Sequence, residues 1–231
     1  MKYFLMSSLV LFFSGFAVAI EEPKYTVLEK FGDFELRSYS PKIIAETQVF
    51  GSMGEASSKG FRLIADYIFG HNTSQRGGGT EKMSMTAPVT IEPQISEPQV
   101  NEPGSEKIEM TTPVSMEQVK GQPAGQLEEL HEDQSRGQWR VYFVMPSEYS
   151  LETLPKPNNP AVTLREIPAI KYAVIRFSGF AGETKVANKT VELMAWLKNK
   201  EIESTGQVEL ARYNPPWTLP FLRRNEVMVA Y

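Results

Sequence analysis

The chain has 231 residues, of which 41% are hydrophobic, and its formal net charge at pH 7 is −4. This length is enough for the core of one large domain, and the excess of acidic residues argues against nucleic acid or an anionic membrane as a partner. The chain has no cysteine, which excludes disulfides, thiolate nucleophiles and cysteine-ligated metals.

Residues 1–19 predict a secretory signal peptide that is removed from the mature chain. Lys2 supplies a positive start, residues 4–16 are almost wholly apolar, and Ala17-Val18-Ala19 has the small-x-small pattern of a cleavage site. An uncleaved N-terminal anchor is the alternative, although the apolar stretch is short for a membrane span. We therefore expect one mature domain over residues 20–231, without a stable membrane span, in the periplasm or outside the cell. The absence of disulfides favours a bacterial periplasm.

Two segments have the apolar periodicity of amphipathic helices. In the first, Ser52 and Glu55 form a capping box ahead of an apolar stripe, and Gly70 is a stop signal. This stripe consists of Met53, Ala56, Gly60, Ile64, Tyr67 and Ile68. The second helix is predicted from a stripe of Val186, Thr190, Leu193, Met194 and Leu197.

Most of the remaining chain predicts β-strands, because β-branched and aromatic residues are concentrated in short runs. These runs are residues 25–28, 34–39, 42–50, 139–144, 162–167, 172–177, 208–213 and 227–231.

The order of these elements repeats. Each half of the chain reads strand, strand, glycine, helix and further strands, and residues 45–51 correspond to residues 173–179. Two such units bury more surface when they pair around a pseudo-twofold axis. We predict an α+β fold in which duplicated β-β-α-β units form a strongly twisted, partly closed β-barrel flanked by two α-helices.

A shorter duplication lies in the middle of the chain. Residues 81–89 (EKMSMTAPV) are echoed by residues 106–114 (EKIEMTTPV). Apolar residues alternate in both copies, which predicts strands with one buried face. Because Pro88 and Pro113 lack a backbone N–H, they belong at a sheet edge or at a bulge, and we expect the two copies to form an edge hairpin.

Short motifs are spread through the whole chain. They are ELRSY at 35–39, MTAPV at 85–89, MTTPV at 110–114, FVMPS at 143–147, LPKP at 154–157, FSGF at 177–180, YNPPW at 213–217 and RRNEV at 223–227. In this order they resemble the SOUL haem-binding protein family, over about residues 24–231. The resemblance implies the duplicated barrel with two helices. It also implies haem or another tetrapyrrole as the ligand, bound chiefly in an apolar pocket beside the first helix.

The resemblance is incomplete at the positions that contact haem in the family. Some members use a histidine in the strand before the first helix as an axial iron ligand, and Ser38 stands at that position here. Others place basic residues on the first helix to meet the haem propionates, and the matching positions are Ser58 and Asp66. The resemblance therefore implies binding by apolar contacts, with weak or absent ligation of the iron.

The first helix offers a candidate ligand-binding wall. Ser57, Phe61 and Ile68 lie beside its buried stripe, and Lys59 and Arg62 stand next to them. An apolar wall with a cationic rim suits a tetrapyrrole that carries two carboxylates. The alternative is that Phe61 and Ile68 are core residues, while Lys59 and Arg62 form a solvated face.

Two residues outside this wall are also candidates. His71, which follows the first helix, is the candidate metal ligand because imidazole binds haem iron; a solvated loop histidine is the alternative, as it is for His131. Trp217, within a proline-rich segment, is a candidate for ligand recognition, and its alternative is a plug at one end of the barrel.

Charged residues near the C-terminus have a structural interpretation. Arg223, Arg224 and Glu226 stand just before the last predicted strand. Arginines and a glutamate in this position predict a buried ion-pair network that closes the domain, and ligand binding is the alternative.

No nucleophile elbow, phosphate loop, dinucleotide-binding fingerprint or catalytic triad is present, so we expect a binding protein rather than an enzyme. The leading hypothesis is an exported binding protein or carrier for haem or a related tetrapyrrole. One alternative is a structural or interaction protein that keeps the fold without binding haem. Another is a hydrolase that uses carboxylates in a cleft.

Overall fold

A computed structural model describes residues 20–94 and 137–231. The predicted signal peptide, the second copy of the short duplication and His131 lie outside these residues. The elements, in chain order, are β1 (Tyr25–Phe31), β2 (Phe34–Tyr39), β3 (Lys42–Phe50), α1 (Met53–Ile68), β4 (Asn72–Thr73), β5 (Val89–Gln94), β6 (Gln138–Val144), β7 (Lys156–Pro157), β8 (Thr163–Ile167), β9 (Ile170–Phe177), α3 (Glu183–Asn199), β10 (Val208–Arg212), the 3-10 turn η1 (Pro220–Leu222) and β11 (Asn225–Ala230).

Nine strands form one antiparallel sheet in the order β1-β2-β9-β11-β10-β5-β6-β3-β8, and β4 pairs separately with β7. Without β1, this order is symmetric. Read from the opposite end, it is the same once each strand is replaced by its counterpart in the other half of the chain. β2 then corresponds to β8, β3 to β9, β5 to β10 and β6 to β11. The midpoint of the sheet is the β5–β10 pair, where Ile91 lies opposite Leu210. The predicted α+β fold with an internal duplication is therefore confirmed.

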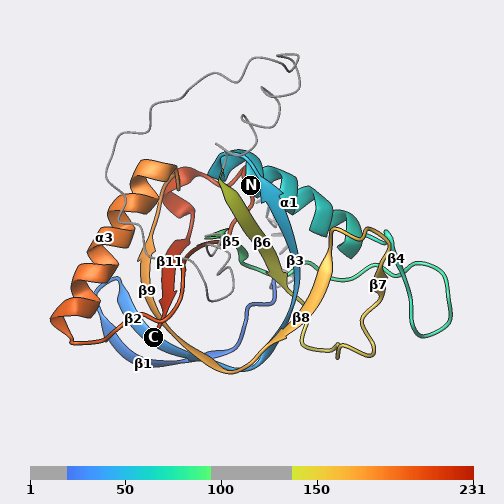
Figure 1. The fold of residues 1–231 in the computed structure, drawn as a ribbon, viewed down its shortest axis with the longest axis horizontal. Coiled ribbons are helices and arrows are strands. Elements are labelled where there is room, and N and C mark those ends of the chain that lie inside the picture. Colours follow the sequence, from blue (N-terminus) through green and yellow to red (C-terminus); the bar gives the residue numbers. More distant parts are fainter. Residues whose placement is uncertain (1–19, 95–136) are drawn as a thin grey trace, which may run out of the picture.

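The sheet curls until strands that are far apart in its order meet. Tyr142 on β6 and Tyr172 on β9 both donate to Glu209 on β10, at 2.6 and 2.9 Å. The Nζ of Lys42 on β3 lies 5.0 Å from the ring centroid of Tyr39, near the other end of the sheet. Figure 1 shows the resulting partly closed barrel, with α1 and α3 flanking it on the outside.

Helix α1 forms and packs as its sequence predicts. The Ser52 side chain accepts from the backbone of Glu55, whose side chain accepts from the backbone of Ser52, so the capping box is present. Gly60 faces β6 so closely that an added Cβ would lie 2.5 Å from the side chain of Val141. The missing side chain thus lets the helix approach the sheet and bury its apolar stripe.

Helix α3 is less buried than its predicted stripe implies. Leu193 and Leu197 are buried, but Met194 is exposed and Thr190 is only half-buried. Phe34 on β2 stacks on Trp196 with ring centroids 5.0 Å apart. Contact on this side therefore also comes from an aromatic residue outside the predicted stripe.

The predicted edge hairpin is wrong in its described half. Residues 83–85 are not part of a strand, and β5, which begins at Val89, lies in the middle of the sheet between β10 and β6. Pro88 precedes this strand and removes no ladder hydrogen bond. Pro93 lies within it, opposite Trp139 on β6 and beyond the residues that pair with β10. The pseudo-twofold axis, rather than the two prolines, determines where β5 lies.

Candidate ligand-binding groove

The two helices leave part of the sheet uncovered on their side. α1 packs mainly on β3 and β6, and α3 on β9 and β11. The strands between them, β5 and β10, form the floor of a groove that we call the inter-helix groove. Its position on the pseudo-twofold axis follows from the duplication.

The inter-helix groove contains a cavity of about 570 Å³. Most of its lining is apolar, and the volume lies within the range of small-molecule pockets, about 300–1,000 Å³. The lining residues are Gly51, Ser52, Met53, Ile91, Pro93, Gly137, Trp139, Glu183, Val186, Ala187, Thr190, Val208 and Leu210. The cavity can therefore take a flat apolar molecule between the two helices.

Trp139 forms a fixed part of the cavity wall. Its indole N–H donates to the carbonyl of Gly51 at 2.9 Å. The N–H of Gly51 in turn donates to the carbonyl of Gly137 at 3.2 Å. Gly51 has φ +141°, a backbone conformation that residues with a side chain rarely adopt. The turn before α1 thus holds the indole in place, which preorganises the wall for an aromatic ligand.

Arg212 spans the inter-helix groove next to this cavity. Its guanidinium donates to the Ser57 hydroxyl on α1 at 2.7 Å and to the Ala181 carbonyl just before α3 at 3.0 Å. Burial lowers the pKa of Arg212, and the nearby charge of Arg223 lowers it further. Leu210, two residues earlier on the same face of β10, lines the cavity.

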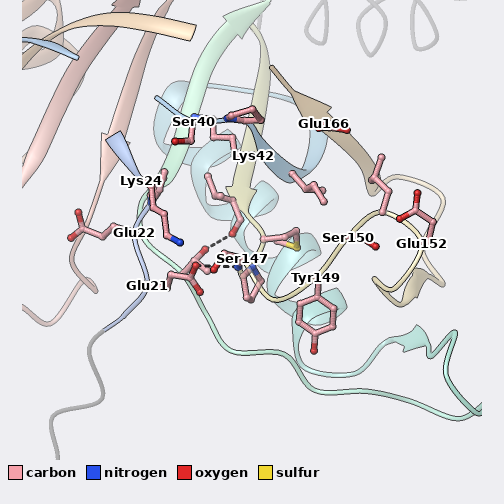
Figure 2. A pocket seen from close by; sticks show the side chains of 18 residues that line it. Glu21, Glu22, Lys24, Ser40, Lys42, Ser147, Tyr149, Ser150, Glu152 and Glu166 are labelled. Atoms are coloured by element: carbon pink, nitrogen blue, oxygen red, sulfur yellow. Dashed lines mark hydrogen bonds between the residues drawn. The ribbon is translucent and has the colours of Figure 1, made fainter. Parts of the chain in front are cut away.

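A second cavity of about 380 Å³ lies at the end of the barrel, and we call it the barrel-end cleft. Figure 2 shows Glu21, Lys24 and Ser147 close together on one side of this cleft, with Glu152 and Glu166 on the other. The Ser147 N–H donates to the Glu21 carboxylate at 3.0 Å. Charged groups of both signs line the cleft, so it suits a large apolar ring less well than the inter-helix groove does.

Inside the barrel, Glu226 is the centre of a buried charge network. It accepts from Arg37 at 2.8 and 3.0 Å, from Tyr213 at 2.7 Å and from Arg224 at 2.9 Å. Burial opposes its charge, but the hydrogen bonds and charges of the two arginines outweigh burial and hold the pKa of Glu226 below its ordinary value. The predicted pair of Arg224 with Glu226 is present. Arg223 is not part of this network, because it donates to backbone carbonyls of the loop that carries Trp217.

A second carboxyl in the barrel interior has the opposite shift. Burial, and then the charge of Glu92, raises the pKa of Glu209 despite its bonds to Tyr142 and Tyr172. Close by, burial lowers the pKa of Lys42, whose amine lies near three tyrosine rings. Glu209 is buried, whereas Lys42 is half-buried and lines the barrel-end cleft; neither residue lines the cavity of the inter-helix groove.

The residues of the predicted wall lie at different places on α1. Ser57 is half-buried and faces Arg212. Phe61 is 39% exposed, with its ring centroid 5.6 Å from that of Phe143. Ile68 is 1% exposed and belongs to the main core, so its place in an exposed wall is wrong and its alternative as a core residue holds.

The charged and loop candidates are exposed. Lys59 and Arg62 lie on the solvent side of α1, as in their alternative interpretation. His71 is exposed just past the last turn of α1, whereas the cavity lies beside the first turn; its Nδ1 is 2.5 Å from the Asp66 carboxylate. Trp217 is 82% exposed, so it does not plug the barrel. None of these residues lines the cavity.

No local sequence pattern points to the residues that do line the cavity. Met53 belongs to the predicted apolar stripe of the first helix and Leu210 to the predicted strand over residues 208–213, whereas Ile91 lies just beyond the strand predicted from residues 81–89. The duplication contains the missing information, because it places β5 and β10 at the centre of the sheet. Among the described residues, no group of three or more histidine, aspartate or glutamate side chains could hold a metal ion. No helix in the described ranges is long and apolar enough to span a membrane.

The chain was compared with known proteins. A family model described as SOUL heme-binding protein matches residues 20–102 and 95–230. No curated protein is significantly similar. Among solved structures, the C-terminal domain of EcmrR is 12% identical, with a TM-score of 0.52 and coverage of 89% of this chain and 96% of that chain. An uncharacterized conserved protein from Listeria innocua is 10% identical, with a TM-score of 0.51 and coverage of 85% and 91%. EcmrR in a DNA complex is 12% identical, with a TM-score of 0.51, and the match covers 85% of this chain and 56% of that chain. At these identities the structural matches show a shared fold only.

Proposed function

Because the chain belongs to the SOUL heme-binding protein family, we propose that it is a binding protein that holds haem or a related tetrapyrrole in the inter-helix groove. The observation that carries this proposal is the apolar cavity of about 570 Å³ between α1 and α3. Burial of apolar surface contributes about 25 cal/mol per Å², so a large flat ring gains most of its affinity from such a lining. The fixed indole of Trp139 offers a face for stacking.

Iron ligation contributes little in this proposal. Among the described residues, the cavity lining contains no histidine or tyrosine, and its ligand-type side chains are Met53 and Glu183. A methionine thioether ligates haem iron in some proteins, usually with histidine as the second ligand. His71 lies past the other end of α1 and is held by Asp66. We therefore propose that the predicted axial ligand His71 is dispensable.

The test is a titration of haemin into purified residues 20–231, followed by the Soret band. We expect a shifted band that saturates at one equivalent. Ala187→Phe places a ring in the cavity from the solvent side of α3 and should abolish the shift. Val191→Phe, on an exposed position of the same helix, is the matched control and should bind normally. His71→Ala should leave the band unchanged. A spectrum equal to that of free haemin would reject the proposal.

Export and a carrier role are further parts of the proposal. The support is the signal-like pattern of residues 1–19, which ends just before the described domain. We expect the mature protein to begin at Ile20 and to be found outside the cytoplasm. N-terminal sequencing and cell fractionation test this, and a cytoplasmic protein that retains Met1 would refute it.

A structural or interaction protein is the second candidate, and one surface favours it. Phe180, Trp217 and Phe221 are large exposed apolar residues on two adjoining loops, which a hydrogen bond from Gly179 to Pro220 joins at 2.8 Å. Exposed apolar patches often mark protein contacts. If this candidate is correct, haemin does not bind. The protein should then self-associate in analytical ultracentrifugation, and Trp217→Ser should weaken that association.

A further inference from the structure

Building on the proposed function, we propose that Arg212, with Arg223 beside it, is a carboxylate-binding subsite of the inter-helix groove. The ligand class that follows is an acidic amphiphile, which has a flat apolar body and at least one carboxylate. The apolar body would occupy the cavity, and the carboxylate would lie over the guanidinium of Arg212.

The hydrogen bonds of Arg212 leave donors free. Both of its acceptors, the Ser57 hydroxyl and the Ala181 carbonyl, are neutral. A guanidinium has more N–H donors than these two contacts use, and its planar fork fits a carboxylate. Glu183 lines the neighbouring cavity, and the hydrogen bonds that Arg212 forms go to other residues.

Other largely buried arginines of the described chain are neutralised. Arg37 and Arg224 pair with Glu226 at 2.8 and 2.9 Å, and Arg140 pairs with Glu92 at 2.8 Å. Arg212 has no carboxylate within ion-pair distance among the described residues. Arg212 is half-buried, and a partly desolvated cation without a counter-ion is unfavourable; an anionic ligand would remove that cost.

Arg223 adds a second cation to the same place. Its guanidinium donates to the carbonyls of Thr218 and Pro216 and lies 4.8 Å from the ring centroid of Phe180. The charge of Arg223 acts on Arg212 and contributes to lowering the pKa of that residue. Two neighbouring cations that donate only to neutral oxygens favour an anion between or above them.

The surroundings of this subsite are apolar and connect to the cavity. Ser57, which holds Arg212, is one helical turn from Met53 in the cavity lining. Phe61 follows one turn later, and Phe180 is largely exposed next to Ala181. A ligand that reaches Arg212 from the cavity therefore keeps its apolar body covered.

The experiment compares haemin with haemin dimethyl ester, which has the same ring without free carboxylates. In the wild type, haemin should bind more tightly than the ester. Arg212→Gln should weaken haemin binding by about ten- to a hundredfold, the range expected for a lost charge-assisted hydrogen bond, and should leave ester binding unchanged. Arg212→Lys should recover part of the loss. Arg62→Gln, on the solvent face of α1, is the control and should change neither affinity.

A second probe separates this proposal from haem binding. cis-Parinaric acid and its methyl ester are a fluorescent apolar carboxylate and its neutral partner. If haemin does not bind but the acid binds in an Arg212-dependent way, the haem proposal fails and the subsite holds. If haemin and its ester bind equally and Arg212→Gln has no effect, haem binding holds and the subsite is refuted. If Arg212→Gln weakens the binding of the acid and of its ester equally, the subsite is also refuted, because the role of Arg212 would then be structural. If no probe binds, both proposals fail.

Discussion

Arg37 is the residue on which the barrel interior depends most. Its side chain is 2% exposed and bonds to Glu35, Tyr39 and Glu226. We expect Arg37→Met to reduce the free energy of unfolding by about 3–5 kcal/mol, because it removes the buried cation shared by Glu35 and Glu226 and leaves these carboxylates with Lys30 and Arg224 alone. Urea denaturation measures this. Glu192→Gln, which breaks the exposed pair with Lys189, is the control and should cost less than about 1 kcal/mol.

A double replacement tests the cause of that loss. Arg37→Met combined with Glu226→Leu removes both charges, and we expect it to be more stable than Arg37→Met alone, because apolar groups replace a buried pair at little cost. If the double variant is less stable than the single one, packing rather than charge explains the effect.

The two buried glutamates should give opposite pH dependences. The pKa of Glu226 is lowered, so its contribution to stability is present above the ordinary value of 4.5 and is lost as the pH falls through the folded-state pKa. The pKa of Glu209 is raised, so its contribution is complete below 4.5 and is lost as the pH rises through the folded-state pKa.

Glu209→Gln isolates the second effect. Glutamine cannot ionise, so the difference in unfolding free energy between the variant and the wild type should move in favour of the variant as the pH rises above 4.5. Denaturation at a series of pH values measures the difference. A difference that is constant with pH would contradict the raised pKa.

Individual residues were predictable from sequence where their role is local. The capping box of Ser52 and Glu55 depends on neighbours along the chain, and it is present. Arg37 was not predicted as the main partner of Glu226, because that contact depends on how β2 and β11 face the barrel interior. The sequence pattern allows Ile68 both in the buried stripe and in the ligand-binding wall, and its burial in the core confirms the stripe.

At the scale of elements, the contact of α1 with β6 depends on one glycine. A Cβ on Gly60 would lie 2.5–2.8 Å from three atoms of Val141, so Gly60→Ala forces the helix and sheet apart. We expect a loss of about 1–3 kcal/mol of unfolding free energy, the usual cost of overpacking. Gly54→Ala, in the same helix with nothing within 4 Å of its added Cβ, should instead gain up to about 1 kcal/mol.

A double-mutant cycle attributes the loss to this contact. In a Val141→Gly background all three clashing atoms of residue 141 are removed, so Gly60→Ala should cost much less than in the wild type. Equal costs in the two backgrounds would mean that Gly60 is needed for another reason.

The positions of the strands along the chain were predicted better than their pairing in the sheet. The bounds of β2 and β3 match the predicted runs, because strand residues carry a local signal. The pairing of β5 was mispredicted because Pro88, which lacks an N–H, suggested a strand at the edge of the sheet. β5 is a central strand, and its own proline, Pro93, lies where β5 pairs with β6 but not with β10. Strand neighbours depend on the whole topology and not on one residue's missing N–H.

At the scale of the whole molecule, the repeat in the sequence was sufficient to predict the duplicated barrel and its two helices. It was not sufficient to predict the cavity lining, which combines residues from both helices with the floor strands and with the turn at Gly51. The residues that line a groove between two repeats can be identified only when the register across the β5–β10 pair is known.

The same register makes the two ends of the groove unequal. Ile91 and Leu210 are equivalent across the axis, so the counterpart of Arg212 is Pro93, and the counterpart of Trp139, opposite Pro93, is Asn225, opposite Arg212. A pigment with its carboxylates on one edge would thus meet a cation at one end of the groove and an indole at the other, and would insert with that edge toward Arg212. With zinc protoporphyrin as a diamagnetic probe, nuclear Overhauser contacts from the Trp139 indole should then fall on the edge opposite the propionates, and Arg212→Gln should add contacts to the propionate methylenes.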